Sequence, residues 1–400
     1  MKDCPPLNVL VVGAGMYVCG RGTNGYGTIL PTLYQARRNG LTSSLQIAAT
    51  SAESLIVLQD KMRGLNELWG FDQQAKLYPK AGKDPKAYRQ AIQKSGKPDC
   101  AIVSVPDHLH FEITADLLKQ GIHCLVVKPL APTVAEVREL IQLAQLNGAY
   151  GAVEFHKRYD RSNLKLRDTI QQGLIGDPLY FIVEYSQRKN IPLEAFRSWV
   201  CHTNILQYLG VHYIDIIYFA TRAIPRRVMA LGQMNYLSGQ GVGTWDSIQC
   251  FIEWEAESGV RFTSAVLTNW IDPERTSAMS DQKIKVIGTK GRYEADQKRR
   301  GITIVTDDTG MEEPNPDFSA FYGTGKGEGI SIQGYGPESI LQFLKDVRDI
   351  KGGMLKPGDL EGRRPTFRES LIPTVILEAA NRSLAMEGSW INCELPANIQ

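Results

Sequence analysis

Hydrophobic residues in the first third of the chain form short uninterrupted runs, and the segments between these runs carry hydrophobic residues at helical spacing. Uninterrupted runs are typical of strands that are buried on both faces of a parallel sheet, and their alternation with helices is typical of a doubly wound α/β architecture. We therefore predict such a domain over residues 1–150. Its expected strands are Asn8–Val12, Leu45–Thr50, Cys100–Val105, Cys124–Val127 and Tyr150–Glu154.

After Phe155 the hydrophobic segments become longer, and polar residues alternate with hydrophobic ones. This alternation favours strands of an antiparallel sheet with one buried face, and short Gly-containing segments between them predict hairpin turns. We expect an α+β domain over residues 151–400, built on a large, mainly antiparallel open sheet. Its expected helices are Asn163–Gln172, Asn204–Phe219, Pro337–Asp349 and Phe367–Met386.

One stretch of the second half, Thr306–Gly329, is polar and rich in glycine and proline. Such a composition is atypical of a core segment, so we expect a long excursion that does not belong to the core. The chain shows no convincing internal repeat.

Composition and charge exclude several classes of protein. The 400 residues include 45 Lys and Arg against 43 Asp and Glu, and a net charge of +2 gives no sign of a nucleic-acid or membrane partner. No apolar stretch is long enough for a membrane span, and the first residues lack the pattern of a signal peptide. The seven cysteines form no CxxC pair and no Cys/His cluster of ligand spacing, which favours reduced thiols, a cytoplasmic location and no metal site.

A pair of glycines follows the first predicted strand. Gly13 permits a tight turn after the strand, and Gly15 lets a pyrophosphate approach the backbone, as in dinucleotide-binding Rossmann domains. An ordinary strand-to-loop turn is the alternative, but the strand–helix alternation that follows favours dinucleotide binding. We expect Gly13, Gly15 and Met16 to contact the cofactor.

The residue that would hold the adenosine ribose is replaced. In this fold the second strand normally ends in an acid that binds the ribose hydroxyls of NAD, whereas here Thr50 and Ser51 stand at that point. Ser51 would not repel the 2′-phosphate of NADP, yet no arginine follows at once to bind it. Glu53 is either the missing acid or a carboxylate in the first turn of a helix. The expected cofactor is NAD, with Ser51 among its contacts, and NADP is left open.

A second glycine-rich stretch follows the glycine turn before a helical pattern resumes near Thr28. We interpret Met16–Gly27 as an inserted loop that leaves the sheet at the edge where ligands bind. One hypothesis is that the loop folds over the cofactor, with Arg21 on a phosphate or on the substrate and with Asn24 and Tyr26 as further contacts. The other is a solvent-exposed loop without ligand contacts.

Residues Cys100–Leu140 carry a combination of motifs. One strand is followed by Pro106-Asp107-His108-Leu109-His110, then by a helix and a Gly-x-His, and the next strand ends in Val127-Lys128-Pro129. This combination resembles the Gfo/Idh/MocA oxidoreductases, the family of glucose–fructose oxidoreductase and inositol dehydrogenase. In the second half, Leu209–Ile217 is similar to the family's Gly-x-His-x-x-Asp helix, and ESLIPTVILEAANRSLAMEGSWI resembles its final helix. The resemblance spans nearly the whole chain.

Four features depart from the family's pattern, namely the enlarged glycine-rich loop and three replacements. Val127 stands in place of the glutamate that usually precedes the lysine. Tyr208 stands four residues before His212, where the family usually has aspartate, and Ser51 replaces the ribose-binding acid. These departures indicate a divergent subgroup.

The resemblance implies that Lys128 and His212 handle the proton in a dehydrogenase reaction, and that the Lys128-Pro129 bond is cis. A lysine at a strand end, partly desolvated and near a positively charged nicotinamide ring, is expected to have a lowered pKa and to accept a proton. A neutral His212 could take the proton of a substrate hydroxyl while the hydride leaves. Tyr208 shares a helical face with His212, so it is a third catalytic candidate, although aromatic packing explains it equally well.

A wider set of contacts is expected, in part from the resemblance and in part because the residues lie near the domain junction or just before the His212 helix. A solvated basic turn is the alternative for His156 and Arg158, and packing in a core is the alternative for Trp199. The expected cofactor contacts in the second motif are Pro106, Asp107, His110 and Lys128, and the expected substrate contacts are Lys128, His156, Arg158, Trp199, Asn204, Tyr208 and His212.

The resulting hypothesis is an NAD(P)-dependent oxidoreductase whose second domain binds the substrate and forms a homo-oligomer through its sheet. The resemblance implies oxidation of a secondary hydroxyl of a sugar, glycoside or cyclitol to a keto-sugar. Two alternatives stay open. One is redox-neutral, NAD-dependent glycoside cleavage through a transient keto-sugar. The other is a non-catalytic dinucleotide-sensing regulator, against which the retention of both Lys128 and His212 argues.

Overall fold

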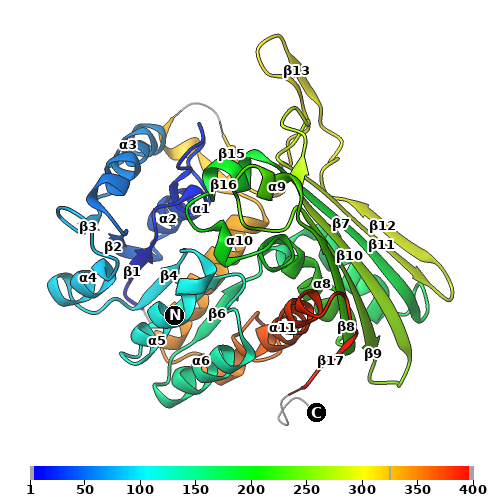
Figure 1. Ribbon diagram of the computed structural model, residues 1–400. Helices are drawn as coiled ribbons and strands as arrows, with labels where there is room; N and C mark the ends of the chain where they lie inside the picture. Colours follow the sequence, from blue (N-terminus) through cyan, green and yellow to red (C-terminus); the bar gives the residue numbers. More distant parts are fainter. Residues whose placement is uncertain (1–3, 324–325, 396–400) are drawn as a thin grey trace. The chain divides into compact units, whose positions relative to one another are not determined.

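The computed structural model describes residues 4–323 and 326–395, and this part of the chain folds into two compact units, each with its own sheet (Figure 1). Unit 1 consists of the residues up to Leu130, Ala135–His156 and Asp317–Glu369, and unit 2 consists of Ala131–Val134, Lys157–Pro316 and the residues from Ser370 on.

Unit 1 is built on a six-stranded parallel sheet of order β3-β2-β1-β4-β5-β6. This is the strand order of the Rossmann fold, and it confirms the predicted doubly wound sheet. The order reverses between β1 and β4, and ligands of such sheets bind at this point, beyond the carboxyl ends of the strands. The strands are β1 (Leu7–Val12), β2 (Thr42–Ala48), β3 (Lys76–Tyr78), β4 (Cys100–Val103), β5 (His123–Val127) and β6 (Gly151–Glu154).

Helices pack around this sheet, and one core cluster joins residues of β1 and β2 to residues of three helices, α2, α3 and α10. Figure 1 shows α2 and α3 beside β1 and β2, whereas α5 and α6 lie beside β4 and β6. The helices of unit 1 are α1 (Met16–Cys19), α2 (Ile29–Arg38), α3 (Ala52–Trp69), α4 (Ala87–Ser95), α5 (His110–Leu118), α6 (Val134–Leu146) and α10 (Tyr335–Lys351), with a short hairpin of β15 (Ala320–Tyr322) and β16 (Ser331–Gln333).

Residues 317–369 return to unit 1 after the chain has formed most of unit 2. Ile340, Phe343 and Leu344 of α10 belong to the core cluster of β1 and β2, so a single boundary at residue 150 divides the chain differently from the structure. Hydrophobic periodicity identifies a helix with one apolar face, but it does not identify the core against which that face packs.

Unit 2 is built on a seven-stranded sheet of order β12-β11-β7-β10-β9-β8-β17. All neighbouring strands are antiparallel except β7 and β10, which confirms the predicted, mainly antiparallel sheet. Buried and partly exposed residues alternate along β9, as expected for a sheet with one covered face. The strands are β7 (Pro178–Arg188), β8 (Ile224–Gln233), β9 (Ser247–Glu255), β10 (Arg261–Asp272), β11 (Ser280–Gly288), β12 (Arg292–Asp296) and β17 (Ile391–Asn392).

Helices α8 and α11 cover one face of this sheet, where α11 packs against β8 and α8 packs against α7 and α11 (Figure 1). A separate hairpin of β13 (Ile304–Thr306) and β14 (Gly310–Glu312) projects from the sheet and is exposed. The helices of unit 2 are α7 (Arg161–Gln171), α8 (Val211–Thr221), α9 (Tyr236–Gly239) and α11 (Leu371–Ala385), together with the π turns η3 (Ile191–Ala195) and η5 (Leu206–Gly210).

The predicted excursion over Thr306–Gly329 is only partly correct. Its first part forms the exposed β13–β14 hairpin, but its end enters the β15–β16 hairpin of unit 1. There Ile330 and Ile332 belong to the core cluster, and the guanidinium of Arg38 donates a hydrogen bond to the carbonyl oxygen of Gly327 (2.8 Å). The residues described at the end of this segment therefore help to close unit 1.

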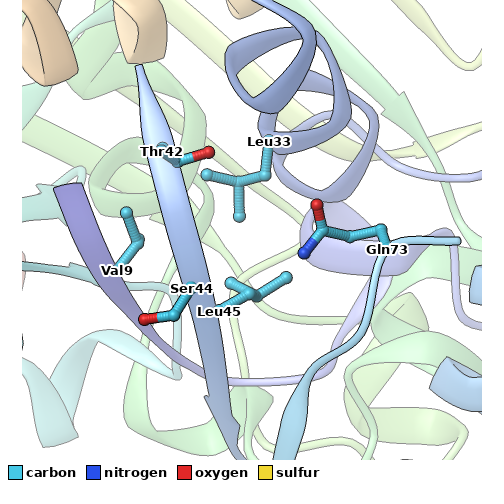
Figure 2. Close-up of a pocket in the computed structure, with 6 residues that line it drawn as sticks. All are labelled: Val9, Leu33, Thr42, Ser44, Leu45 and Gln73. Carbon is cyan, nitrogen blue, oxygen red and sulfur yellow. The ribbon is translucent and has the colours of Figure 1, made fainter. Parts of the chain in front are cut away.

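A small cavity lies inside unit 1 between β1, β2 and α2, with the amide of Gln73 at its edge (Figure 2). It has room for about one water molecule. Thr42 and Ser44 line it at the beginning of β2, which is the opposite end of the strand from the ligand edge. The cavity therefore lies away from the edge of the sheet where ligands bind. None of the helices in the described part of the chain is long and apolar enough to span a bilayer.

Candidate active site

The glycine turn after β1 leaves room for a ligand on one side only. Gly13 has a φ of +125°, and a Cβ atom there would lie 2.0 Å from the carbonyl oxygen of Ser104, so no other residue fits. A Cβ atom on Gly15, in contrast, would meet no protein atom within 4 Å. Met16 begins the single turn of α1 next to this open space. The turn thus fits a pyrophosphate that approaches the backbone at Gly15.

Lys128 follows β5 directly, at the carboxyl end of the parallel sheet, and its peptide bond to Pro129 is cis, as the resemblance implies. Desolvation by the surrounding protein lowers the pKa of the Lys128 ammonium to about 7, although the carboxylates of Asp107 and Glu154 act in the opposite direction. A lysine in this state exchanges its proton near neutral pH, which suits a general base.

His110 connects the end of β4 to the segment that carries Lys128. Its Nδ1 lies 2.7 Å from the carbonyl oxygen of Pro129, and its Nε2 lies 2.9 Å from that of Val105. The ring is fully buried, and burial lowers the pKa of His110, so a neutral ring donates to one of the two carbonyl groups at a time. The structure therefore places His110 behind Lys128 as a support.

Asp107 and Pro106 lie in the turn between β4 and α5. Pro106 precedes the 3₁₀ turn η1 (Asp107–Leu109), and the Asp107 carboxylate is buried and accepts a hydrogen bond from the backbone N–H of His108 (3.0 Å). Because Asp107 influences the pKa of both Lys128 and His110, it belongs to the same electrostatic cluster.

Glu154 belongs to this cluster although the sequence analysis did not select it as a site residue. It ends β6, where it is paired in register with Val127, the residue that replaces the family's glutamate. Its carboxylate is buried: Oε2 accepts a hydrogen bond from Nδ1 of His156 (2.8 Å), and Oε1 has no hydrogen-bond partner among the described residues. The available signal was an acid at the end of a buried apolar strand, beside the strand that carries Lys128.

His156 is buried against aromatic rings of unit 1. Its imidazole stacks on Tyr335 with a centroid separation of 5.6 Å, contacts Phe318 at 5.4 Å, and has the hydroxyl of Tyr17 at 3.5 Å from Nδ1. The side chain is therefore not part of a solvated basic turn.

Ser51 caps the amino end of α3, where its hydroxyl accepts a hydrogen bond from the N–H of Ser54 (3.2 Å). It lies three residues beyond the end of β2, at the ligand edge of the sheet. The position fits the adenosine ribose of a dinucleotide.

His212 lies in the first turn of α8 in unit 2 and is only 3% exposed. The π turn η5 precedes α8 and contains Tyr208, so Tyr208 and His212 lie in two consecutive elements of different helical type. A π turn has more residues per turn than an α-helix, and such turns are frequent at functional sites.

Tyr208 and Trp199 belong to an aromatic cluster. The ring of Phe196 contacts Trp199 at a centroid separation of 4.5 Å and Tyr208 at 4.9 Å, and Tyr208 also contacts Trp270 at 5.9 Å. Both Trp199 and Tyr208 remain partly exposed, so each has an edge available to a ligand.

Arg158 and Asn204 make internal bonds within unit 2. The buried Arg158 guanidinium donates from Nε (2.8 Å) and from one terminal nitrogen (2.6 Å) to the two carboxylate oxygens of Asp215, one turn after His212 in α8. The Asn204 amide nitrogen donates to Asn381 of α11 (2.9 Å), and its oxygen accepts from the N–H of Gln207 (2.9 Å). These contacts fix α8 and the turn before it.

The structure thus gathers one set of the predicted residues at the carboxyl edge of the sheet in unit 1 and another around α8 in unit 2. Within the described residues, no cluster of three or more His, Cys, Asp or Glu side chains has the arrangement of a metal site. The first set is Gly13, Gly15, Met16, Ser51, Pro106, Asp107, His110, Lys128 and His156, and the second is Arg158, Trp199, Asn204, Tyr208 and His212.

Two family models match the sequence. The first, described as an oxidoreductase family with an NAD-binding Rossmann fold, matches residues 7–155, and the second, the GFO/IDH/MocA C-terminal domain, matches residues 163–294. The first model ends at the residue after Glu154, and the second begins within α7. Together the two models cover both the Lys128 cluster and α8.

Several known proteins are similar to this chain. A myo-inositol 2-dehydrogenase of Thermotoga maritima is 26% identical over 64% of this chain and 70% of the relative. A D-glucoside 3-dehydrogenase of Escherichia coli is 28% identical, but the match covers only 43% of this chain and 47% of the relative. The crystal structure of an inositol dehydrogenase homologue from Azotobacter vinelandii, complexed with NADH and myo-inositol, superimposes with a TM-score of 0.69 at 16% identity over 97% of this chain and 98% of the other. At this identity the likeness shows the fold.

Proposed function

The chain belongs to the Gfo/Idh/MocA family of oxidoreductases, and on that premise we propose that it is an NAD-dependent dehydrogenase that oxidises a secondary hydroxyl of a sugar, glycoside or cyclitol to a ketone. The observation that carries this proposal is Lys128, a lysine of lowered pKa at the carboxyl edge of a Rossmann sheet. The names of the relatives, myo-inositol 2-dehydrogenase and D-glucoside 3-dehydrogenase, support a polyol or glycoside substrate.

The residues of unit 1 fit a nicotinamide dinucleotide. The open space at Gly15 would receive the pyrophosphate, with Gly13 and Met16 in the same turn, and Ser51 would lie at the adenosine ribose. Pro106 and Asp107 would lie at the nicotinamide end beside Lys128, because they follow the neighbouring strand β4, and the buried His110 would support the segment that carries Lys128. When bound, NAD supplies the hydride acceptor.

Lys128 and His212 would handle the proton of the substrate hydroxyl. Near neutral pH a large share of Lys128 is uncharged, so its Nζ can accept a proton or donate a hydrogen bond to the hydroxyl oxygen. His212 contributes a second group that can accept the proton. Tyr208, which lies within η5, would orient the hydroxyl or the imidazole.

The remaining substrate contacts would come from partly buried polar and aromatic groups. Trp199 offers an edge of its ring to the apolar face of a sugar. Asn204, Arg158 and His156 make the internal bonds described above, so their expected effect on substrate binding is exerted largely through the segments that they hold.

A substrate screen tests the proposal. The purified chain is incubated with NAD and a panel of inositols, sugars and methyl or aryl glycosides, and both NADH absorbance and the sugar products are followed. We expect NADH and a ketone in equal amounts from at least one cyclitol, sugar or glycoside. Release of an aglycone without net NADH would replace the dehydrogenase by redox-neutral cleavage. Tight NAD binding without any conversion would favour a non-catalytic regulator.

A further inference from the structure

We propose that Arg21, Ser51 and Ser54 form a binding site for the 2′-phosphate of NADP, so that this chain binds NADP at least as tightly as NAD. This inference rests on the proposed function in one respect, because both require that unit 1 binds a dinucleotide. It differs from the NAD preference expected from the sequence, because the arginine comes from the loop before α2 and not from the residues after Ser51.

The place of this site is set by the topology of the sheet. In a Rossmann sheet the adenosine ribose lies at the carboxyl end of β2, and an acid at that point binds the 2′-hydroxyl and repels a 2′-phosphate. Here the chain continues from β2 to Ser51, whose hydroxyl lies 3.0 Å from the hydroxyl of Ser54. Two neutral hydroxyl groups therefore occupy the position of the usual acid.

Arg21 completes a row of three polar side chains. Its Nη1 donates a hydrogen bond to Oγ of Ser54 (2.9 Å), which in turn pairs with Oγ of Ser51. A guanidinium has five N–H donors, and within the described residues this is the only hydrogen bond that the Arg21 side chain makes. The other N–H groups face solvent on an exposed side chain, so they are available to a phosphate.

The loop that carries Arg21 is held in place against α3. Lys61 of α3 donates hydrogen bonds from Nζ to the carbonyl oxygens of Thr23 (2.8 Å) and Gly25 (2.7 Å). The ring of Tyr26 packs on α3 so closely at Gly64 that a Cβ atom there would lie 2.7 Å from the Tyr26 hydroxyl. The loop therefore presents Arg21 from a fixed base, which lowers the entropic cost of ordering it around a ligand.

Of the polar and aromatic residues that the sequence analysis selected in this loop, Arg21 is the one that we propose meets a ligand. Tyr26 is used in packing against α3 and against Phe321 (6.1 Å between ring centroids). Met16–Cys19 forms the turn α1, so the loop itself begins only at Gly20, whose left-handed φ of +72° ends that turn.

The charges around the row favour a phosphate monoester. Lys83 forms an isolated β-bridge with Ser51, which brings a second exposed cation to the end of β2. The opposing charge is Glu53, an exposed carboxylate in the first turn of α3. An arginine with several unused donors matches the oxygens of a phosphate dianion, whereas a ribose hydroxyl uses only one of them.

Equilibrium binding measured by calorimetry tests this proposal without relying on turnover. The probes are NADP⁺, NAD⁺, 2′-AMP and 5′-AMP, titrated into the wild type, Arg21→Ala, Ser54→Ala and Arg21→Lys. We expect the wild type to bind NADP⁺ at least as tightly as NAD⁺. Arg21→Ala should weaken the binding of NADP⁺ and 2′-AMP at least about tenfold, because the charge-assisted contact with the 2′-phosphate is lost. The affinity for NAD⁺, which has no 2′-phosphate, should change less than about threefold. Arg21→Lys should recover part of the loss.

Arg63→Ala is the matched control, because it removes the same charge from the exposed surface of α3, where Arg63 pairs with Asp60. It should leave the binding of all four probes unchanged. Equal weakening of NADP⁺ and NAD⁺ binding by Arg21→Ala, or a wild type that binds NAD⁺ more tightly than NADP⁺, would overturn the proposal. If the chain oxidises a polyol with NAD but does not bind NADP, only the inference of an NADP site is overturned. If the chain binds NADP in an Arg21-dependent way but oxidises no substrate, only the proposed dehydrogenase function is overturned.

Discussion

Lys128 owes its pKa to its burial and to two carboxylates, one in the turn after β4 and one at the end of β6. Val127 lacks the charge that the family usually carries beside this lysine, but Glu154, its partner in register on β6, carries a buried carboxylate. The negative charges of Asp107 and Glu154 raise the pKa of Lys128. Desolvation lowers this pKa by a larger amount, so the resulting value is about 7. A replacement within β5 is thus offset by an acid at the end of the next strand.

Removal of the Glu154 charge should shift the pH dependence of oxidation toward acid. Oxidation needs uncharged Lys128, so kcat/KM should rise with pH through a midpoint near 7. Glu154→Gln removes a charge that raises the pKa of Lys128, so the midpoint should fall, by a few tenths to about one unit. Profiles of kcat/KM against pH measure this, and Glu139→Gln, on the exposed side of α6, is the control. An unchanged or higher midpoint would contradict the assignment of Lys128 as the base.

The proton-handling pair should be separable from cofactor binding. We expect Lys128→Ala and His212→Ala each to lower turnover by at least roughly a hundredfold, the usual effect of losing a general acid–base group. The affinity for NAD should persist in both variants, because the glycine turn is untouched. Turnover and calorimetric affinity are measured on the same preparations. Near-normal turnover of His212→Ala on the true substrate would remove His212 from the mechanism.

At the scale of elements, α8 is held by a buried ion pair and should depend on it. Replacing Arg158 by Met leaves Asp215 buried without its bidentate partner, and breaking such a pair costs about 3–5 kcal/mol of the free energy of unfolding. The double variant Arg158→Met/Asp215→Leu should recover much of that loss. Arg227→Met is the control, because its bidentate pair with Glu253 lies on the exposed sheet surface, where an ion pair contributes little to stability. Denaturant unfolding gives the free energy of unfolding of each variant. Equal losses of this free energy in Arg158→Met and Arg227→Met would contradict a structural role for Arg158.

The elements with a clear hydrophobic period could be predicted, and those defined by a few contacts could not. Five strands and the large antiparallel sheet followed from the patterns, whereas β3 has only three residues and no period of its own. The turn α1 was placed in the inserted loop, because four residues between glycines carry too little pattern. The π turn η5 has the same apolar spacing as a helix, so the sequence could not separate it from α8.

The residues of the candidate site likewise divide into those that the sequence could predict and those that it could not. Lys128, His110 and the glycine turn lie at strand ends, so the order of strands in a doubly wound sheet predicts that they gather. Arg21 and Ser54, in contrast, meet because Lys61 holds a loop against α3, a contact between residues about forty positions apart. A single sequence does not reveal such a long-range hydrogen bond.

At the scale of the whole molecule, the sheet of unit 2 has one covered and one open face. Val183, Val266 and Cys250 form a fully buried row across β7, β10 and β9, on the face that α8 and α11 cover. The neighbouring row points away from these helices, is apolar and is at least partly exposed: Ile182, Ala265, Phe251 and Met229. An apolar row of this kind on an open sheet marks an interaction surface.

We expect this open face to join two copies of the chain, because an identical surface on each copy can pair with itself around a two-fold axis. Ile182→Lys places a charge in the middle of the row, and burying an unpaired charge at an interface is costly. The wild type should therefore elute as a dimer or a larger even-numbered assembly in light-scattering chromatography, and Ile182→Lys should be a monomer with an unchanged circular dichroism spectrum. Leu146→Lys, an exposed apolar position of α6 in unit 1, is the control and should keep the wild-type mass. A monomeric wild type, or an Ile182→Lys variant that remains assembled, would show that this face does not join copies of the chain.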